Sequence, residues 1–315
     1  MLTLDPALFR PEAISEETAA FNAKFEATLA ELPATHEIPP EVTRAARDAG
    51  KGIFPAHGPI DGSEWRDIPG GRVRITPPPG DKATGVYIHI HGGGWTVGRP
   101  SYHDALNQEL AQAAGCAVVS LEYRLAPENP WPAGPDDCLN GALWALDHAG
   151  AEFGTDRFAI GGESAGGHLS AVTLLRLREA GRVHQVRGAM LMYGAFDLRL
   201  TAKLRNWGER KLVLNTPAVE WFTANLTPDA AVRDTPAASP ILADLSGMPP
   251  ALFQVGTMDP LMDDTLQMAA RWAGAGLDAR LNVWPGGIHA FDVFDIDIAR
   301  KARAATAAFL REVFA

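Results

Sequence analysis

Short apolar runs alternate with segments of helical periodicity along most of this chain, most regularly from residue 85 onward. Continuous apolar strands separated by helices are typical of a sheet with helices on both faces, so the pattern predicts an α/β fold with a mostly parallel central sheet. Strands are expected at residues 71–76, 85–90, 116–122, 157–161, 188–193, 251–255 and 279–284. Helices are expected at residues 104–114, 137–148, 165–180, 264–273 and 298–313.

Two regions fall outside this alternation, residues 1–60 and residues 198–247. In the first, residues 16–32 predict an amphipathic helix with Phe21, Phe25 and Leu29 on one stripe and Thr18 as its cap. The second is too long for a plain connection. We interpret both as a helical cap over the carboxyl ends of the strands, which leaves residues 61–197 and 248–315 as the core. The alternative is an N-terminal tail and an unrelated insertion.

Composition argues against several partners. The 38 acidic and 28 basic residues give a formal net charge of −10, which repels nucleic acid and anionic lipid headgroups. The sequence shows neither a basic segment leading into an apolar stretch at its start nor a run of about 18 apolar residues, so we expect a cytoplasmic protein without a membrane partner. Its two cysteines, Cys116 and Cys138, are expected to be buried thiols.

A Gly-x-Ser-x-Gly motif occupies residues 162–166, between a predicted strand and a predicted helix. In that position it predicts a tight turn in which glycines leave room for close neighbours and the serine has a strained backbone. Ser164 would then be a nucleophile at a helix N-terminus, where free N–H groups favour developing negative charge. Taken alone, the motif also fits a glycine-rich turn without chemistry.

Three glycines, residues 92–94, follow His91 and the predicted strand 85–90. Their backbone N–H groups can approach a carbonyl oxygen because no side chain stands in the way, and Ala165 after the nucleophile supplies a further N–H. The run therefore predicts an oxyanion hole, although glycine runs also mark plain loops. We expect His91 to brace this loop and His89 to be a hydrogen-bonded core residue.

A carboxylate and a histidine follow later strands, in the order serine, acid, histidine. Asp259 follows the predicted strand 251–255, and His289 follows the predicted strand 279–284. His289 would accept the serine proton, and Asp259 would orient the imidazole and stabilise its cation. Asp263 and Asp264 compete for the acid role but are expected to begin the next helix. The remaining histidines lack metal-ligand spacing along the chain, so no metal is expected.

The blocks HGGGW, YRLAPENPWPAGPDD, GESAGGHL, DPLMD and GGIHAF, in this order between residues 91 and 291, resemble the hormone-sensitive lipase family of α/β hydrolases. The resemblance implies the α/β-hydrolase fold, esterase activity on short to medium acyl chains and no cofactor. Relatives often dimerise, so a homodimer is expected by analogy. By carry-over, the triad is Ser164, Asp259 and His289, and the oxyanion N–H groups belong to Gly93, Gly94 and Ala165.

The hypothesis is a two-step acyl transfer, in which Ser164 attacks an ester carbonyl and water activated by His289 hydrolyses the acyl enzyme. An amidase or arylformamidase with the same triad is an alternative that the sequence does not separate. A non-catalytic receptor for a small ligand on the same scaffold is a second alternative, disfavoured because His289 is present. Expected walls of the substrate pocket are Trp95, Val97, Phe196, Trp207, Leu212, Trp221 and Phe222.

Overall fold

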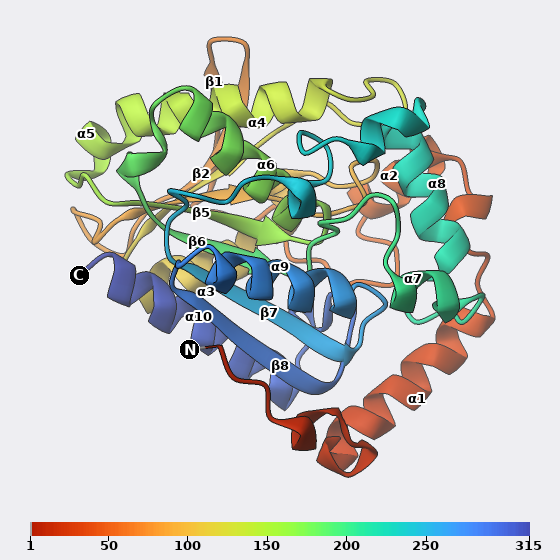
Figure 1. Cartoon of the computed structure of the whole chain (residues 1–315). Helices are drawn as coiled ribbons and strands as arrows, with labels where there is room; N and C mark the ends of the chain where they lie inside the picture. Colours follow the sequence, from red (N-terminus) through yellow and green to blue (C-terminus); the bar gives the residue numbers. More distant parts are fainter. Residues whose placement is uncertain (1) are drawn as a thin grey trace.

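The computed structural model of the protein describes residues 2–315 and forms one sheet of eight strands, in the order β1-β2-β4-β3-β5-β6-β7-β8 (Figure 1). β2 pairs antiparallel with β1 and β4, and all other neighbours are parallel. The strands are β1 (Glu64–Ile68), β2 (Gly71–Thr76), β3 (Val86–Ile90), β4 (Ala117–Leu121), β5 (Phe158–Glu163), β6 (Val186–Met192), β7 (Ala251–Met258) and β8 (Ala279–Ile288).

All predicted strands are present, and two differences concern the edges of the sheet. β1 was not predicted, because its sequence EWRDI is short and largely polar, as suits an edge strand that is mostly solvated. β8 continues past the predicted end at residue 284 to Ile288, through Pro285 and two glycines. This extension places His289 directly at the end of the strand.

The helices agree with the predicted ones in position, with two corrections. The cap of α1 is Ser15, whose Oγ accepts from the Thr18 N–H, while Thr18 itself is buried inside the helix. α4 begins at Ala133 and continues into a π-helical segment, Ala145–Ala149. The helices are α1 (Glu16–Ala30), α2 (Pro40–Asp48), α3 (Asp104–Ala114), α4 (Ala133–Trp144), α5 (Gly150–Phe153), α6 (Ala165–Glu179), α7 (Ala202–Trp207), α8 (Thr216–Leu226), α9 (Met262–Gly274) and α10 (Asp297–Val313).

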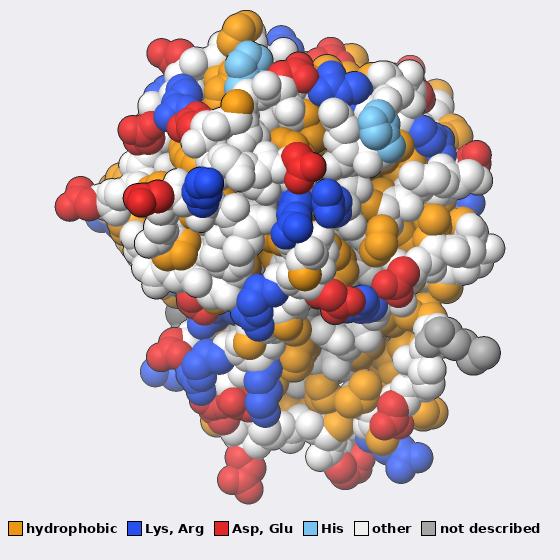
Figure 2. Space-filling model, turned by 90° about the vertical axis from the view of Figure 1, so that its left-hand side faces the viewer, with side chains coloured by type: hydrophobic (Ala, Val, Ile, Leu, Met, Phe, Trp, Pro, Cys, Tyr) orange, Lys and Arg blue, Asp and Glu red, His pale blue; other side chains and the backbone are white. Residues whose placement is uncertain are grey.

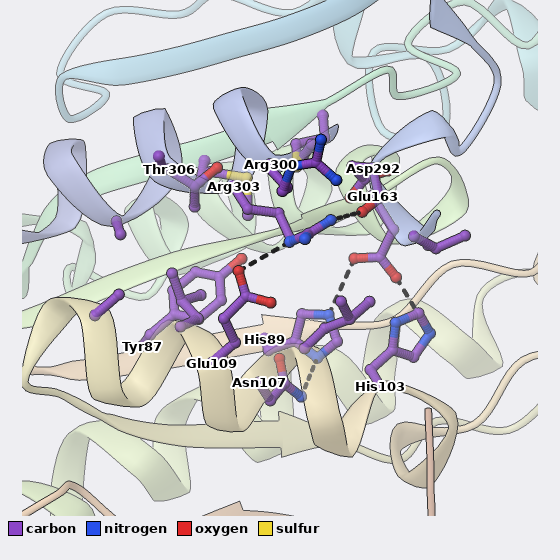
Figure 3. A pocket seen from close by; sticks show the side chains of 18 residues that line it. Tyr87, His89, His103, Asn107, Glu109, Glu163, Asp292, Arg300, Arg303 and Thr306 are labelled. Carbon is purple, nitrogen blue, oxygen red and sulfur yellow. Dashed lines mark hydrogen bonds and ion pairs between the residues drawn. The ribbon is translucent and has the colours of Figure 1, made fainter. Parts of the chain in front are cut away.

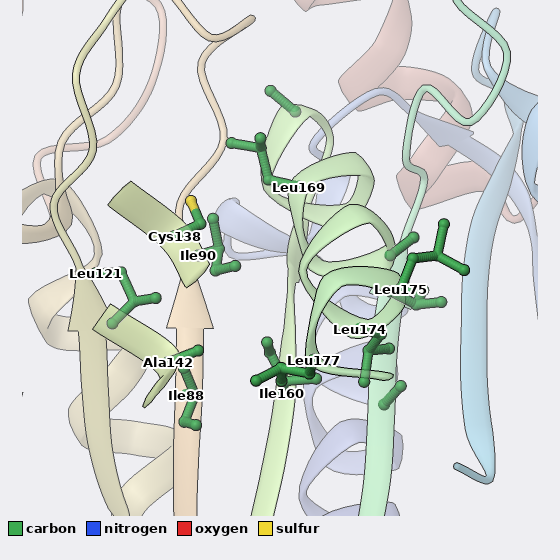
Figure 4. Close-up of a cluster of buried hydrophobic side chains, with 14 of the residues drawn as sticks. Ile88, Ile90, Leu121, Cys138, Ala142, Ile160, Leu169, Leu174, Leu175 and Leu177 are labelled. Carbon is green, nitrogen blue, oxygen red and sulfur yellow. The ribbon is translucent and has the colours of Figure 1, made fainter. Parts of the chain in front are cut away.

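Helices cover both faces of the sheet and bury its apolar strands. α4, α6 and α9 pack on one face, and α3 and α10 pack on the other. Figure 4 shows the first of these layers. Ile90 and Ile88 of β3 lie beside Cys138 and Ala142 of α4, and Ile160 of β5 lies beside Leu177 of α6. Burial on both faces explains why the central strands are continuous apolar runs without alternation. Cys116 and Cys138 are free, buried thiols, as expected.

The two regions outside the alternation contact one another although they are far apart in sequence. Arg210 of the insertion pairs with Glu26 of α1 at 2.7 Å, and Lys211 Nζ donates to the carbonyl of Leu32. α8 also packs against a 3-10 turn, Thr35–Glu37. Figure 1 shows α1, α2, α7 and α8 together on the right-hand side of the view.

Acidic and basic side chains are interspersed on the face of the molecule shown in Figure 2. Exposed ion pairs of the structure include Arg182 with Asp147 and Arg280 with Glu312. In residues 2–315, no helix is both long enough and apolar enough to cross a bilayer.

Candidate active site

Ser164 lies in a tight turn between β5, which ends at Glu163, and α6, which begins at Ala165. Its backbone has φ 57° and ψ −120°, a strained conformation for a residue other than glycine. A Cβ atom on Gly162 or on Gly166 would stand 1.9 Å from the carbonyl oxygen of Ile90. The two glycines of the motif are therefore required by the close approach of β3, and they allow the turn that presents Ser164.

The turn brings Ser164 to a histidine and a carboxylate. His289 Nε2 lies 2.8 Å from Ser164 Oγ, and its Nδ1 lies 2.9 Å from Asp259 Oδ2. The other carboxylate oxygen of Asp259 accepts from the Leu261 N–H at 2.8 Å. Asp259 is 0% exposed and His289 is 3% exposed, so both are shielded from water. This geometry allows Nε2 to accept the serine proton while Asp259 fixes the imidazole orientation.

The two competing carboxylates lie elsewhere, in the first turn of α9. Asp264 accepts from the Asp197 N–H and from the Thr201 hydroxyl, and Asp263 accepts from the Lys203 N–H. Burial raises the pKa of Asp264 to about 7. Asp264 therefore belongs to the packing of α9 against the insertion, and its bonds do not reach the imidazole.

The glycine loop passes beside the nucleophile. A Cβ on Gly92 would stand 3.4 Å from Ser164 Cβ, and Gly93 and Gly94 have φ values of +115° and +57°. Among residues 2–315, none accepts a hydrogen bond from the N–H groups of Gly93, Gly94 or Ala165. These three donors are therefore free for a carbonyl oxygen that develops negative charge.

His91 and Arg44 hold this loop in place. The His91 imidazole is buried, stacks on Tyr123 with 4.2 Å between centroids, and bonds through Nδ1 to the Gly92 carbonyl at 2.9 Å. Burial lowers the pKa of His91 to about 3, so the ring is neutral at pH 7. Arg44 of α2 donates from Nε to the carbonyl of Thr96 at 2.7 Å. The loop is thus fixed from the core and from the N-terminal region.

Four of the expected pocket walls lie near the glycine loop. A Cβ on Gly94 would stand 2.3 Å from the Phe222 ring, so α8 reaches over the loop, and Trp221 lies beside Phe222 with 5.0 Å between ring centroids. Trp95 and Val97 follow the loop and are buried. The Trp95 Nε1–H donates to His168 Nδ1 at 3.1 Å.

The other three lie elsewhere. Phe196 and Leu212 are 0% exposed and belong to the hydrophobic core, where Phe196 packs edge-on against Phe253. These two are corrected from pocket walls to core residues, because full burial leaves them no free surface in this structure. Trp207 is partly buried on α7 and donates from Nε1 to the Arg210 carbonyl.

Sequence reasoning missed the environment of Glu163, the residue before the nucleophile. Its Oε1 accepts from the Gly92 N–H at 2.6 Å, and its Oε2 lies 3.0 Å from His89 Nε2. His103 Nε2 lies 3.4 Å from Oε1. Burial alone raises the pKa of Glu163, but His103, His89 and the Gly92 N–H outweigh burial and lower it to about 2. Glu163 thus ties the nucleophile turn to the glycine loop as a carboxylate.

Tyr193 and Asp292 support the histidine from the side. The Tyr193 ring packs edge-on against His289 with 5.0 Å between centroids, and its hydroxyl donates to Asp292. Burial raises the pKa of Asp292 to about 6. Only the fold brings Tyr193 to His289, since Tyr193 follows β6 and is far from His289 in the sequence.

Residues 87–293 match a family model described as alpha/beta hydrolase fold. Two curated relatives are carboxylesterases by name, both from Mycobacterium tuberculosis. Carboxylesterase NlhH is 33% identical over 287 residues, covering 88% of this chain and 84% of its own length. Carboxylic ester hydrolase LipN is 38% identical over 212 residues, covering 64% of this chain and 56% of its own length. A solved hormone-sensitive lipase from a metagenome library superposes with a TM-score of 0.84 at 27% identity, covering 95% of this chain and 98% of its own.

The match spans the glycine loop, the nucleophile turn, and the loops of Asp259 and His289. The chain is therefore an α/β hydrolase. Within this class, it belongs to the hormone-sensitive lipase family. Membership of this family makes it a serine ester hydrolase.

Proposed function

We propose that the protein is a carboxylesterase in which Ser164 is the nucleophile, His289 the general base and acid, and Asp259 the residue that orients His289. The observation that carries the proposal is the continuous hydrogen-bonded path from Ser164 Oγ through the imidazole to Asp259. Attack on the ester carbonyl gives an acyl enzyme and releases the alcohol. His289 then activates water, which releases the acid and restores the hydroxyl of Ser164.

The N–H groups of Gly93, Gly94 and Ala165 stabilise the oxyanion in both steps. Two observations support this role: the loop lies beside Ser164, and none of these three donors has a protein acceptor within residues 2–315. Each such donor is worth about a hundredfold to a thousandfold in rate.

The N-terminal region and the insertion form a cap that limits the acyl chain to short and medium lengths. Two contacts support this role: the Arg210–Glu26 pair joins the insertion to α1, and Phe222 of α8 packs over Gly94 of the glycine loop. Phe222 and Trp221 are the wall residues, together with Trp95 and Val97 beside the loop. A homodimer and a cytoplasmic location stay predictions from the sequence.

The nucleophile is tested by Ser164→Ala, with Ser246→Ala at an exposed serine as the matched control. Hydrolysis of p-nitrophenyl butyrate and labelling by a fluorophosphonate are measured on both. We expect both signals to disappear in Ser164→Ala and to persist in the control, with unchanged melting temperatures. Substantial turnover by Ser164→Ala would refute the proposal, and an unlabelled wild-type protein without turnover would favour the receptor alternative.

The cap is tested with p-nitrophenyl esters from acetyl to dodecanoyl, with anilides and N-formylkynurenine as amide-type controls. We expect wild type to favour the shorter esters and Phe222→Ala to shift the optimum to longer chains, because the ring no longer covers Gly94. Phe9→Ala, at an exposed phenylalanine, is expected to keep the wild-type profile. Faster turnover of the amide-type substrates than of every ester would favour the amidase or arylformamidase alternative.

A further inference from the structure

Three side chains that can ligate a metal converge behind the nucleophile, on the face of the sheet covered by α3 and α10. They are His89 of β3, His103 just before α3, and Glu163 at the end of β5. Figure 3 shows the Glu163 carboxylate between the two imidazoles. The three ligand atoms lie within 4.8 Å of one another. Because these residues come from three separate elements, their spacing along the chain does not reveal the cluster.

We propose that His89, His103 and Glu163 form a binding site for a divalent transition metal, for which Zn²⁺ is the best match. Two imidazole nitrogens and one carboxylate are a ligand set that Zn²⁺ binds with one position left for water. Ligands at about 2.1 Å in tetrahedral geometry are roughly 3.4 Å apart. The separations of 3.0 Å from His89 Nε2 to Glu163 Oε2 and of 3.4 Å from His103 Nε2 to Oε1 are close to that value, with one imidazole at each carboxylate oxygen.

The protonation states suit a metal. Burial lowers the pKa of His103 to about 4, so its ring is neutral at pH 7, while Glu163 is ionised. Neutral imidazole and carboxylate are the forms that ligate. Glu163 also keeps its bond from the Gly92 N–H, because each carboxylate oxygen has more than one lone pair.

His89 is oriented for this role by a neighbouring strand. His89 and Ser120 are partners in the β3–β4 register, and His89 Nδ1 lies 2.7 Å from Ser120 Oγ. In the metal-free protein the Nε2–H donates to Glu163 Oε2. With a metal bound, the ring proton would sit on Nδ1 and its N–H would donate to Ser120 Oγ, which frees the lone pair of Nε2 for the metal. Metal-ligating histidines commonly donate their second N–H to such a partner.

A cavity of about 190 Å³ adjoins the three ligands and gives room for a bound water and a route inward. Tyr87 lines the same cavity, and its buried hydroxyl has no hydrogen-bond partner among residues 2–315. This hydroxyl can therefore donate a hydrogen bond to a molecule bound in the cavity. The cavity reaches the surface at Glu109 and Arg300, which are about half exposed.

The charges around the site are mixed. Asp292 lines the cavity, and Arg303 is neutralised by its pair with Glu109 at 2.9 Å. Arg47, a partly buried cation whose charge acts on both His103 and Glu163, opposes a second cation. We therefore expect weaker binding than at an isolated site with the same three ligands.

The test uses the full chain stripped with EDTA and titrated with Zn²⁺ by calorimetry, and with Co²⁺ by visible absorption. We expect one ion per chain, Co²⁺ bands between about 500 and 650 nm, and a higher melting temperature with Zn²⁺. His103→Gln keeps an N–H donor for Glu163 but is a poor ligand, so it should lower the affinity at least tenfold. His89→Gln should do the same.

Two further variants separate this site from other histidines. His184→Gln removes an exposed histidine, and His289→Ala removes the histidine beside Ser164; both should bind Zn²⁺ like wild type. Equal affinity in wild type and His103→Gln, or loss of binding only in His289→Ala, would overturn the proposal. If His89→Gln does not fold, His103→Gln decides the matter. The readout is metal binding, so it is independent of the esterase proposal.

Discussion

Both carboxylate oxygens of Asp259 have defined partners, His289 Nδ1 and the Leu261 N–H. In Asp259→Asn, the amide can keep the bond from Leu261 while its NH₂ group faces Nδ1. The imidazole proton then moves to Nε2, which can no longer accept the proton of Ser164. We expect kcat/KM for p-nitrophenyl butyrate to fall by about 10⁴-fold.

The matched control for this prediction is Asp263→Asn, in the first turn of α9. Asp263 bonds to the Lys203 N–H and has no bond to His289. Its substitution should change kcat/KM only a few-fold. If the two variants lose turnover equally, Asp259 is not the acid of the triad.

A second prediction at the residue scale concerns the pH dependence of stability. Burial raises the pKa of Asp264 from 3.8 to about 7. Between these pH values the folded carboxyl holds a proton that the unfolded chain releases. The free energy of unfolding therefore falls as pH rises from about 4 to about 7, by up to about 4 kcal/mol from this group. Asp264→Asn has no such titration, so its stability should depend less on pH.

Urea unfolding of wild type and Asp264→Asn at pH 5 and pH 8 measures this difference. Asp292, whose pKa is also raised, titrates in the same direction in both proteins and cancels when they are compared. The free energy of unfolding of Asp264→Asn, relative to that of wild type, should increase as pH rises. Stability curves that run parallel over this range would show that Asp264 is already ionised at pH 5.

At the level of elements, the glycine loop and α8 are in close contact at Gly94. Its φ of +57° is in the left-handed region, and an added Cβ would stand 2.3 Å from the Phe222 ring. In Gly94→Ala the loop or α8 has to move, so we expect kcat/KM to fall about a hundredfold, comparable to the loss of one oxyanion donor. Gly94→Ala/Phe222→Ala should recover part of this loss, because the clash is gone while the backbone strain persists.

Gly181→Ala is the control for the strain that a Cβ adds at a positive φ when no side chain is in the way. Gly181 has φ +72° after α6, and a Cβ there meets nothing within 4 Å. The substitution should lower the free energy of unfolding by about 1–2 kcal/mol and leave kcat/KM unchanged. A double variant as slow as Gly94→Ala would mean that Phe222 does not restrict the loop.

Elements with a continuous apolar signal were predictable, and those whose identity depends on their neighbours were not. The strands β2 to β8 follow from apolar runs in the sequence, whereas β1 is largely polar and is a strand because it pairs with β2. The order of Ser164, Asp259 and His289 also follows from the sequence, since each comes after a strand. The Glu163 cluster does not, because it depends on the strand register that places His89 beside Gly161.

On the scale of the whole molecule, the arrangement of residues 2–60 and 198–247 also depends on neighbours that the sequence does not reveal. Their helices could be expected from apolar stripes, but their mutual contacts depend on single polar pairs such as Arg210 with Glu26. The assignment of Phe196 and Leu212 to a pocket failed for a related reason. A sequence shows that a side chain is apolar, whereas only packing decides whether it faces a cavity or the core.

One buried ion pair joins distant parts of the chain. Asp104, the first residue of α3, is 1% exposed at its side chain and pairs with Arg74 of β2, which is 6% exposed. The Nε of Arg74 lies 2.7 Å from Oδ1, and the Ile60 N–H donates to Oδ2 at 3.1 Å. The carboxylate thus links α3, an edge region of the sheet, and the segment that leads from the N-terminal region into β1.

Asp104→Asn leaves the Arg74 guanidinium buried without its counter-charge, so we expect a loss of about 3–5 kcal/mol in the free energy of unfolding. Asp147→Asn breaks an exposed pair with Arg182 and should cost less than about 1 kcal/mol. Urea unfolding at pH 7 measures both. Similar losses in the two variants would contradict the prediction, because the difference arises from burial: water can solvate Arg182 when its partner is lost, but it does not reach Arg74.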